Sequence, residues 1–124
     1  MGAMEKVSIG IMGDTPQDMA AMAKKAEAAG FDCGWAIELF RNAFTQTTYL
    51  GAHTESMDIG TAIAWGFVRS PMTMAMSAMD IDEISGGRFR LGVGPEVVRD
   101  STPKTAWACP KQPRSTQEAL LKRS

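Results

Sequence analysis

Two hydrophobic periods alternate along most of the chain. Stretches rich in β-branched and apolar residues at every second position predict strands, and apolar residues three or four apart predict helices. The predicted strands span residues 7–12, 31–39, 58–65 and 88–93, and the predicted helices span residues 16–29, 45–55 and 71–85. A strand thus recurs every 25 to 30 residues, with a helix between each pair.

Local signals predict where the helices begin and end. Asp14 or Thr15 can cap the first helix, and Pro16 suits its first turn. Thr45 is the expected start of the second helix, and the Ser70–Pro71 pair the start of the third. Met72, Ala75, Met76 and Met79 recur at helical spacing in that third helix, and we expect this stripe to be buried in the core.

The repeated strand–helix unit predicts an α/β fold with a parallel sheet and right-handed crossovers. Two architectures fit this pattern: a doubly wound open sheet and part of a (β/α)8 barrel of the TIM type. Periodicity alone does not choose between them.

Charge divides the chain near residue 98. Residues 1–98 carry a net charge of −5, and residues 99–124 carry +4 together with Pro103, Pro110 and Pro113. We therefore expect an N-terminal unit over 1–98 and a divergent basic tail over 99–124, in which Ser115–Glu118 is a candidate capping box.

Composition excludes several function classes. The overall net charge of −1 gives no general attraction to nucleic acid, and no apolar run approaches the roughly 20 residues of a membrane span. The first residues lack the apolar core of a secretory signal, so a cytoplasmic protein is expected. Cys33, Cys109 and His53 form no metal-ligand cluster, and Cys33 is expected to pack as a small hydrophobic residue.

Four motifs then stand in order on the predicted elements. They are A-E-A-A-G-F-D at 26–32, followed by Trp35 and Glu38; I-G-T-A-I at 59–63; D-I-D-E-I-S-G-G-R-F at 80–89; and L-G-V-G at 91–94. Together they resemble the bacterial luciferase-like monooxygenase family, and most nearly its coenzyme F-420-dependent branch. The resemblance implies a (β/α)8 barrel. Because such a barrel takes about 250 residues, it also implies that these four units are an incomplete half barrel, from a truncated or frameshifted form with little activity alone.

The resemblance also implies a site at the carboxyl ends of the strands. There it implies a cis peptide between Ala62 and Ile63 that backs the central ring of the cofactor. The cofactor-binding candidates are Thr61, Ala62, Ile63, Gly92, Gly94 and Pro95, and Gly13 and Asp14 are weaker candidates for the substrate. Glu38 is the catalytic candidate, although Leu39 stands where the family often has histidine.

The implied function is that of a flavin- or F-420-dependent oxidoreductase or monooxygenase, with FMN or coenzyme F-420 as cofactor and a small organic molecule as substrate. Arg41, Arg69 and Arg99 are possible substitutes for the phosphate-binding loops of a full barrel. The alternative hypotheses are a non-catalytic remnant and an interaction module. In the latter, exposed strand edges pair two copies into a homodimer.

Overall fold

The structure is a computed structural model that describes residues 5–95. Its elements follow the predicted alternation of strand and helix. They are β1 (Ser8–Ile11), α1 (Pro16–Ala28), β2 (Cys33–Ala36), α2 (Ala43–His53), β3 (Asp58–Thr61), β4 (Ala64–Trp65), the 3-10 turn η1 (Gly66–Val68), α3 (Pro71–Ile84), β5 (Phe89–Arg90) and β6 (Val93–Gly94).

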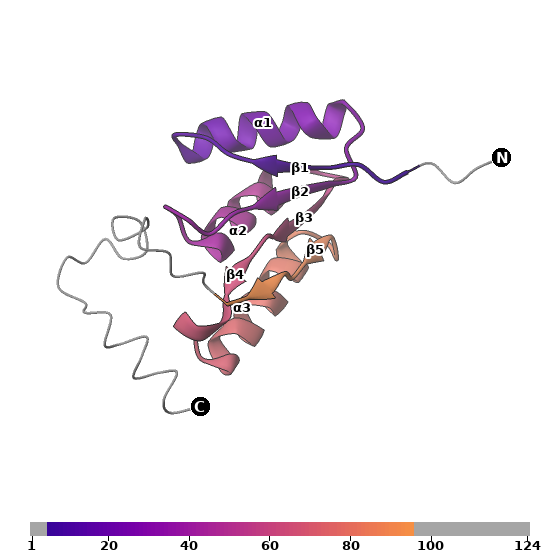
Figure 1. The fold of residues 1–124 in the computed structure, drawn as a ribbon. Helices are drawn as coiled ribbons and strands as arrows, with labels where there is room; N and C mark the ends of the chain where they lie inside the picture. Colours follow the sequence, from indigo (N-terminus) through magenta and orange to yellow (C-terminus); the bar gives the residue numbers. More distant parts are fainter. Residues whose placement is uncertain (1–4, 96–124) are drawn as a thin grey trace.

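The main sheet is parallel throughout. Its strand order is β1-β2-β3-β5, and the register pairs Ser8 with Cys33 and Cys33 with Asp58. The strand order follows the chain order, and α1 contacts α2, which contacts α3, around one side of the sheet (Figure 1). Sequential order with all crossovers on one side is the arrangement of a barrel wall, whereas a doubly wound sheet carries helices on both faces. This confirms the predicted part of a (β/α)8 barrel.

The core lies between the sheet and the helices. Ile11, Ala36 and Ile59 project from successive strands and pack with the buried helix residues Met19, Ala23, Leu50 and Ile81. Cys33 is also buried, as expected, and its burial raises the pKa of the thiol to about 11, so that the side chain is neutral. The helices are thus held to the strands by one apolar layer.

Two of the three predicted helix starts are confirmed. Thr15 caps α1 in a reciprocal capping box with Asp18, and the hydroxyl of Ser70 accepts from the N–H of Thr73 at the start of α3. The predicted start of α2 at Thr45 is wrong: Asn42 is the cap, and its side chain accepts from the N–H groups of Phe44 and Thr45. The side-chain amide of Asn42 caps α2, and Asn42 lies outside the apolar repeat of that helix. The spacing of apolar residues therefore predicts a start that is too late in the sequence.

The predicted burial of the methionine stripe is also wrong. Met72, Met76 and Met79 are 70%, 58% and 71% exposed. The core face of α3 is instead formed by Met74 and Ile81, with the buried C-cap residue Ser85, which lie about half a turn away around the helix. Both sets have helical spacing, and the neighbours in space decide which one is covered.

Two of the predicted strands are interrupted. The strand expected over 58–65 divides into β3 and β4, and the strand expected over 88–93 divides into β5 and β6. The short strands β4 and β6 leave the main sheet and pair with each other in parallel. The interruption therefore occurs at the same level in two neighbouring strands, at their carboxyl ends.

Two charged side chains organise the opposite, amino-terminal end of the sheet. The carboxylate of Glu27, on α1, accepts from the backbone N–H groups of Glu55, Ser56 and Met57 at 2.8–3.2 Å. Burial by itself raises the pKa of Glu27, but these three donors outweigh it and hold the pKa below its usual value. Arg88 donates to the carbonyl oxygens of the same turn, including that of Met57 at 2.6 Å. The turn before β3 is thus fixed from both sides.

The core assignment predicts a large difference between two truncations. Leu50→Ala removes a fully buried side chain and is expected to lower the free energy of unfolding by about 2–5 kcal/mol. Phe40→Ala removes a larger side chain that is 77% exposed, and its expected change is within about 0.5 kcal/mol. Urea unfolding followed by circular dichroism measures both. Equal losses for the two variants would contradict the core described here.

Candidate active site

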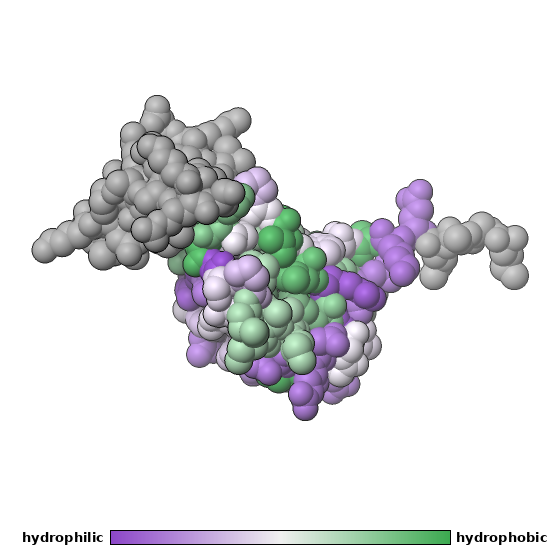
Figure 2. Space-filling model, turned by 90° about the horizontal axis from the view of Figure 1, so that it is seen from below, coloured by the Kyte–Doolittle hydropathy of each residue, from purple (hydrophilic) through white to green (hydrophobic). Residues whose placement is uncertain are grey.

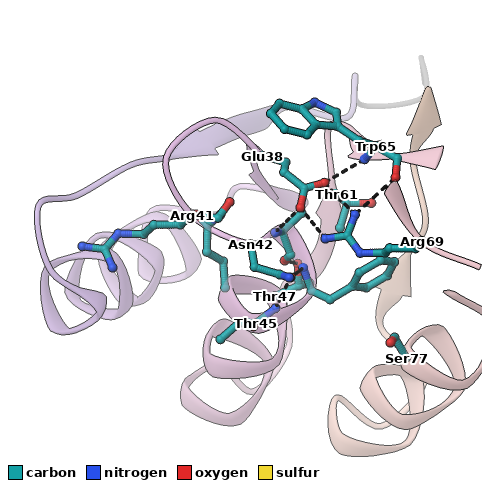
Figure 3. A network of polar contacts seen from close by, with 12 residues as sticks. Glu38, Arg41, Asn42, Thr45, Thr47, Thr61, Trp65, Arg69 and Ser77 are labelled. Carbon is teal, nitrogen blue, oxygen red and sulfur yellow. Dashed lines mark hydrogen bonds and ion pairs between the residues drawn. The ribbon is translucent and has the colours of Figure 1, made fainter. Parts of the chain in front are cut away.

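Glu38 follows the end of β2 and is buried beneath the start of β4. Its carboxylate accepts from the backbone N–H of Trp65 at 2.7 Å and from that of Ala43 at 3.3 Å. Both terminal nitrogens of Arg69 donate to the same carboxylate, one of them at 2.8 Å (Figure 3). This carboxylate therefore connects the end of β2 with the start of α2, with β4 and with the segment that leads into α3.

The ion pair between Glu38 and Arg69 is shielded from solvent. The two side chains are 7% and 10% exposed. Burial alone raises the pKa of Glu38, but the hydrogen bonds from Arg69 and from the Trp65 N–H together outweigh it and hold the pKa below its usual value. Glu38 is therefore a carboxylate at neutral pH, and the contacts above use both of its oxygens.

Arg69 is held by contacts on several sides. Besides Glu38, it donates to the carbonyl oxygen of Trp65 at 3.3 Å, and its guanidinium lies 4.7 Å from the centre of the Phe44 ring. A cation over an aromatic face is stabilised by the ring quadrupole. Because Glu38 occupies its terminal nitrogens, Arg69 is not free to replace a phosphate-binding loop.

The peptide bond between Ala62 and Ile63 is cis, as the resemblance implies. The N–H of Ala62 still bonds to the carbonyl of Ala36 at 2.8 Å, which continues the pairing of β2 with β3. The hydroxyl of buried Thr61 both donates to the carbonyl of Gly92 at 2.8 Å and accepts from its N–H at 3.0 Å. Thr61 thus joins the cis segment to the link between β5 and β6.

Gly92 is required for the close approach of this link to the backbone of the cis segment, and Gly94 packs against the side chain of Ile63. A Cβ atom on Gly92 would lie 2.1 Å from the carbonyl oxygen of Thr61, and one on Gly94 would lie 2.4 Å from the Cδ1 atom of Ile63. The candidate residues Thr61, Ala62, Ile63, Gly92 and Gly94 therefore form one contiguous cluster. Pro95 follows Gly94 directly and is the last described residue.

Four exposed apolar side chains lie at the same edge of the sheet as this cluster. Met12 follows the end of β1, and Ile37 and Leu39 follow the end of β2. Ile63 follows β3, and its side chain is also exposed. Because parallel strands end at the same edge of a sheet, these four side chains belong to one end of the barrel wall. This edge therefore carries apolar side chains as well as the backbone of the cis segment.

Gly13 and Asp14 lie at the same edge, after β1. A Cβ atom on Gly13 would lie 2.9 Å from the backbone nitrogen of Met19, so this glycine lets the chain turn tightly into α1. The backbone carbonyl of Asp14 accepts from Arg41, which ties the loop after β1 to the loop after β2. The structure thus brings both residues to the predicted end of the sheet. They lie next to the loop after β2, which carries Glu38, and not in the cluster that contains Thr61 and Gly92.

A separate cavity of about 620 Å³ lies at the other end of the strands. Its lining includes Ser8, Cys33 and Asp58, the first residues of β1, β2 and β3. Ligands of these barrels bind at the carboxyl ends, so this cavity is not the candidate site. Within residues 5–95, no group of three or more potential metal ligands occurs, and no helix there is long and apolar enough to cross a membrane.

Comparison with known proteins shows which family this chain belongs to. The sequence model of the luciferase-like monooxygenase family matches residues 2–120. The chain belongs to this family. The match continues across the composition boundary near residue 98 into the basic segment.

Similar proteins include enzymes of the F-420-dependent branch. A Mycobacterium tuberculosis protein that carries the name of a coenzyme F-420-dependent oxidoreductase is 37% identical over 87 residues, which cover 67% of this chain and 25% of the relative. The 5,10-methylenetetrahydromethanopterin reductase of Methanolobus tindarius is 37% identical over 79 residues, covering 62% of this chain and 24% of its own length. The chain spans about a quarter of the length of the curated relatives it matches.

Solved structures show the same fold. The F-420-dependent tetrahydromethanopterin reductase of Methanopyrus kandleri superposes with a TM-score of 0.68 at 29% identity, over 79% of this chain and 29% of that one. The oxygenating component of a diketocamphane monooxygenase of Pseudomonas putida, in complex with FMN, superposes with a TM-score of 0.65 at 16% identity, over 98% of this chain and 37% of that one.

The sequence pattern did not reveal Arg69 as the partner of Glu38. The two residues are 31 positions apart, and Arg69 precedes a strong helix start without belonging to any periodic stripe. The burial of Glu38, which creates the need for a cation beside it, is itself a result of the tertiary structure. From the sequence, Arg69 is only one of three possible substitutes for the phosphate-binding loops.

Substitution of Glu38 is expected to show the pH dependence of this ion pair. Because the folded-state pKa of Glu38 is lowered, its stabilisation is present above the usual glutamate range and is lost as the pH falls through the folded-state value. Glu38→Gln leaves a buried arginine without its counter-charge, which costs about 3–5 kcal/mol near pH 7. The difference from wild type is expected to shrink below about pH 4.

Chemical denaturation of the wild type and the variant from pH 7 to pH 3 measures this difference. Glu55→Gln is the matched control, because the same change there affects an exposed side chain. A loss of stability in Glu38→Gln that is independent of pH would contradict a charged Glu38 in the folded state.

Close packing of the β5–β6 link gives a second prediction for this site. Gly92→Ala forces Cβ against a backbone carbonyl and is expected to destabilise the protein by at least about 1–3 kcal/mol. In Gly10→Ala the new Cβ lies 3.8 Å from its nearest neighbour, the Cδ1 atom of Ile37, and the expected change is below about 0.5 kcal/mol. Thermal unfolding of both variants checks the contrast, and an unaffected Gly92→Ala would contradict the described cluster.

Proposed function

We propose that this chain forms the cofactor-binding part of an F-420- or FMN-dependent oxidoreductase that acts on a small organic molecule. The observation that carries the proposal is the carboxyl edge, where the cis Ala62–Ile63 segment shares one end of the sheet with exposed apolar side chains that follow β1, β2 and β3. Membership of the family and the F-420-dependent relatives support it.

The residues present fit a flat tricyclic ring. Met12, Ile37, Leu39 and Ile63 offer apolar contact, and the backbone of the cis segment offers polar groups beside it. The absence of a side chain on Gly92 lets the β5–β6 link approach that segment, and the two hydrogen bonds between Thr61 and Gly92 hold it there. When bound, the ring supplies hydride transfer, and a flavin can in addition activate oxygen.

Glu38 acts in this proposal as a positioning residue. Its carboxylate holds the N–H of Trp65, only two residues after the cis bond, and it stays ionised in its pair with Arg69. Leu39 contributes apolar surface in place of a proton-transferring histidine. In this proposal, the described residues therefore bind and orient the ring.

The test is titration of the full purified chain with FMN and, separately, with coenzyme F-420. We expect a shift in the absorption spectrum or quenching of fluorescence with one of them. Ile63→Glu places a charge on the proposed apolar surface at a side chain that is already 36% exposed, and it is expected to weaken binding at least tenfold.

Ile84→Glu is the matched control, because the same substitution falls on an exposed isoleucine at the far end of α3. It is expected to leave cofactor affinity unchanged. Absence of binding to both cofactors, with a folded protein by circular dichroism, would refute the proposal for this chain and favour a non-catalytic remnant.

A further inference from the structure

Outside α3, the exposed large apolar side chains of residues 5–95 are concentrated at one end of the sheet. All of them except Val7 belong to segments that follow the carboxyl end of a strand of the main sheet. The exposed apolar side chains of α3 lie on another surface: Figure 2, which views the molecule from the side of α3 in Figure 1, shows a pale green hydrophobic area at the centre of this side. The side chains at the carboxyl edge are Met12, Ile37, Leu39, Phe40, Ile63, Phe67, Leu91 and Val93.

Phe40 is held in its exposed position by the loop that carries it. The side-chain amide of Gln46, which is buried, donates to the carbonyl oxygen of Ile37 at 3.0 Å and to that of Arg41 at 3.1 Å. Leu39 and Phe40 lie between these two anchored carbonyl groups and are 39% and 77% exposed. The loop after β2 therefore presents two apolar side chains from a fixed backbone and does not pack them into the core.

The buried carboxylate of Glu38 joins the loop of Phe40 to that of a second exposed phenylalanine. Glu38 lies two residues before Phe40, and it accepts from the N–H of Trp65 and from the guanidinium of Arg69. Phe67 stands midway between Trp65 and Arg69 in the sequence and is 48% exposed. Because one carboxylate joins the loop after β2 to the segment around η1, the two exposed phenylalanines belong to adjoining loops of the carboxyl edge.

The arginines of this edge are already engaged. In the described segments that follow the carboxyl ends of the strands, the cationic side chains are Arg41 and Arg69. Glu38 occupies both terminal nitrogens of Arg69. Arg41 donates to the carbonyl oxygen of Asp14, and Figure 3 shows its side chain extending away from the pair of Glu38 and Arg69. In these segments, no guanidinium is therefore both unpaired and directed toward the Glu38 contact.

The amino ends of α2 and α3, which also lie at this edge, are satisfied by the protein itself. Helix amino ends commonly bind anions through their unpaired N–H groups. At α2, the N–H of Ala43 bonds to Glu38, and the next two N–H groups bond to the side chain of Asn42. At α3, the N–H of Thr73 bonds to the hydroxyl of Ser70. An anionic ligand would therefore compete with caps that are already in place.

We propose that the substrate is an uncharged, largely apolar molecule, which contacts Phe40 and Phe67 while it lies against the cofactor ring. The proposal rests on the proposed function, in which Leu39 and Ile63 contact that ring. Hydride transfer requires contact between the reacting atoms of ring and substrate. The substrate therefore occupies the space next to these residues, where Phe40 directly follows Leu39. A carboxylate or phosphate group there would lose its hydration without gaining a protein partner.

The experiment compares two probes of equal carbon number, 4-phenylbutan-2-one and 4-phenylbutanoate, which differ in charge. The full chain is first saturated with FMN or with coenzyme F-420, whichever it binds, and each probe is then titrated while its NMR signals are followed. We expect the ketone to bind at least about tenfold more tightly than the carboxylate. Equal affinities, tighter binding of the carboxylate or no binding of the ketone would overturn the proposal and leave the cofactor site intact. Absence of binding to either cofactor would refute the proposed function as well.

Substitutions at the two phenylalanines locate the contact. Phe40→Ala and Phe67→Ala are each expected to weaken binding of the ketone by about fivefold or more, with an unchanged affinity for the cofactor. Val7→Ala is the matched control, because it truncates an apolar side chain 52% exposed at the opposite end of the sheet, and no loss is expected.

Phe40→Lys is expected to reverse the preference between the two probes, because it supplies the missing cation. A ketone affinity that is unaffected by substitution at both positions overturns the proposal. A change in the solution mass of the chain in Phe40→Ala overturns it as well, since that result assigns the loop to a contact between copies.

Discussion

The buried carboxylate of Glu38 is the contact on which the geometry of the carboxyl edge depends. It receives hydrogen bonds from the start of α2, from β4 and from Arg69, which leads into α3. An ionised group can be buried at this position only because each oxygen has a donor. The elements that supply those donors are therefore fixed relative to the end of β2.

That arrangement positions the segment around the cis bond. Glu38 holds Trp65 from one side, Ala36 pairs with Ala62 within the sheet, and Thr61 bonds to Gly92 from the other side. The apolar side chains of this edge then project from a backbone that is fixed on all of these sides. A rigid backbone beside an apolar surface suits a planar cofactor, because little conformational entropy is lost on binding.

At both ends of the sheet, a carboxylate and an arginine form hydrogen bonds with backbone groups. At the amino end, Glu27 accepts from backbone N–H groups of the turn before β3, and Arg88 donates to its carbonyl oxygens. At the carboxyl end, Glu38 accepts from the N–H of Trp65 in β4, and Arg69 donates to its carbonyl oxygen. Charged side chains are used at both ends as ligands for backbone groups, and the apolar layer between sheet and helices supplies the main driving force for folding.

The sequence by itself determined the order of strands and helices, the parallel sheet, two of the three helix caps and, through its motifs, the family and the location of the cis bond. These features depend on local chemistry: periodicity, Ser–Pro and Thr–Pro starts, and glycines at turns. Only the tertiary structure decided the partner of Glu38, because Arg69 is brought to it by packing between distant elements. It also decided which stripe of α3 is buried. Met72, Met76 and Met79 have the same spacing as a core face, and only the position of the sheet shows that they point away from it.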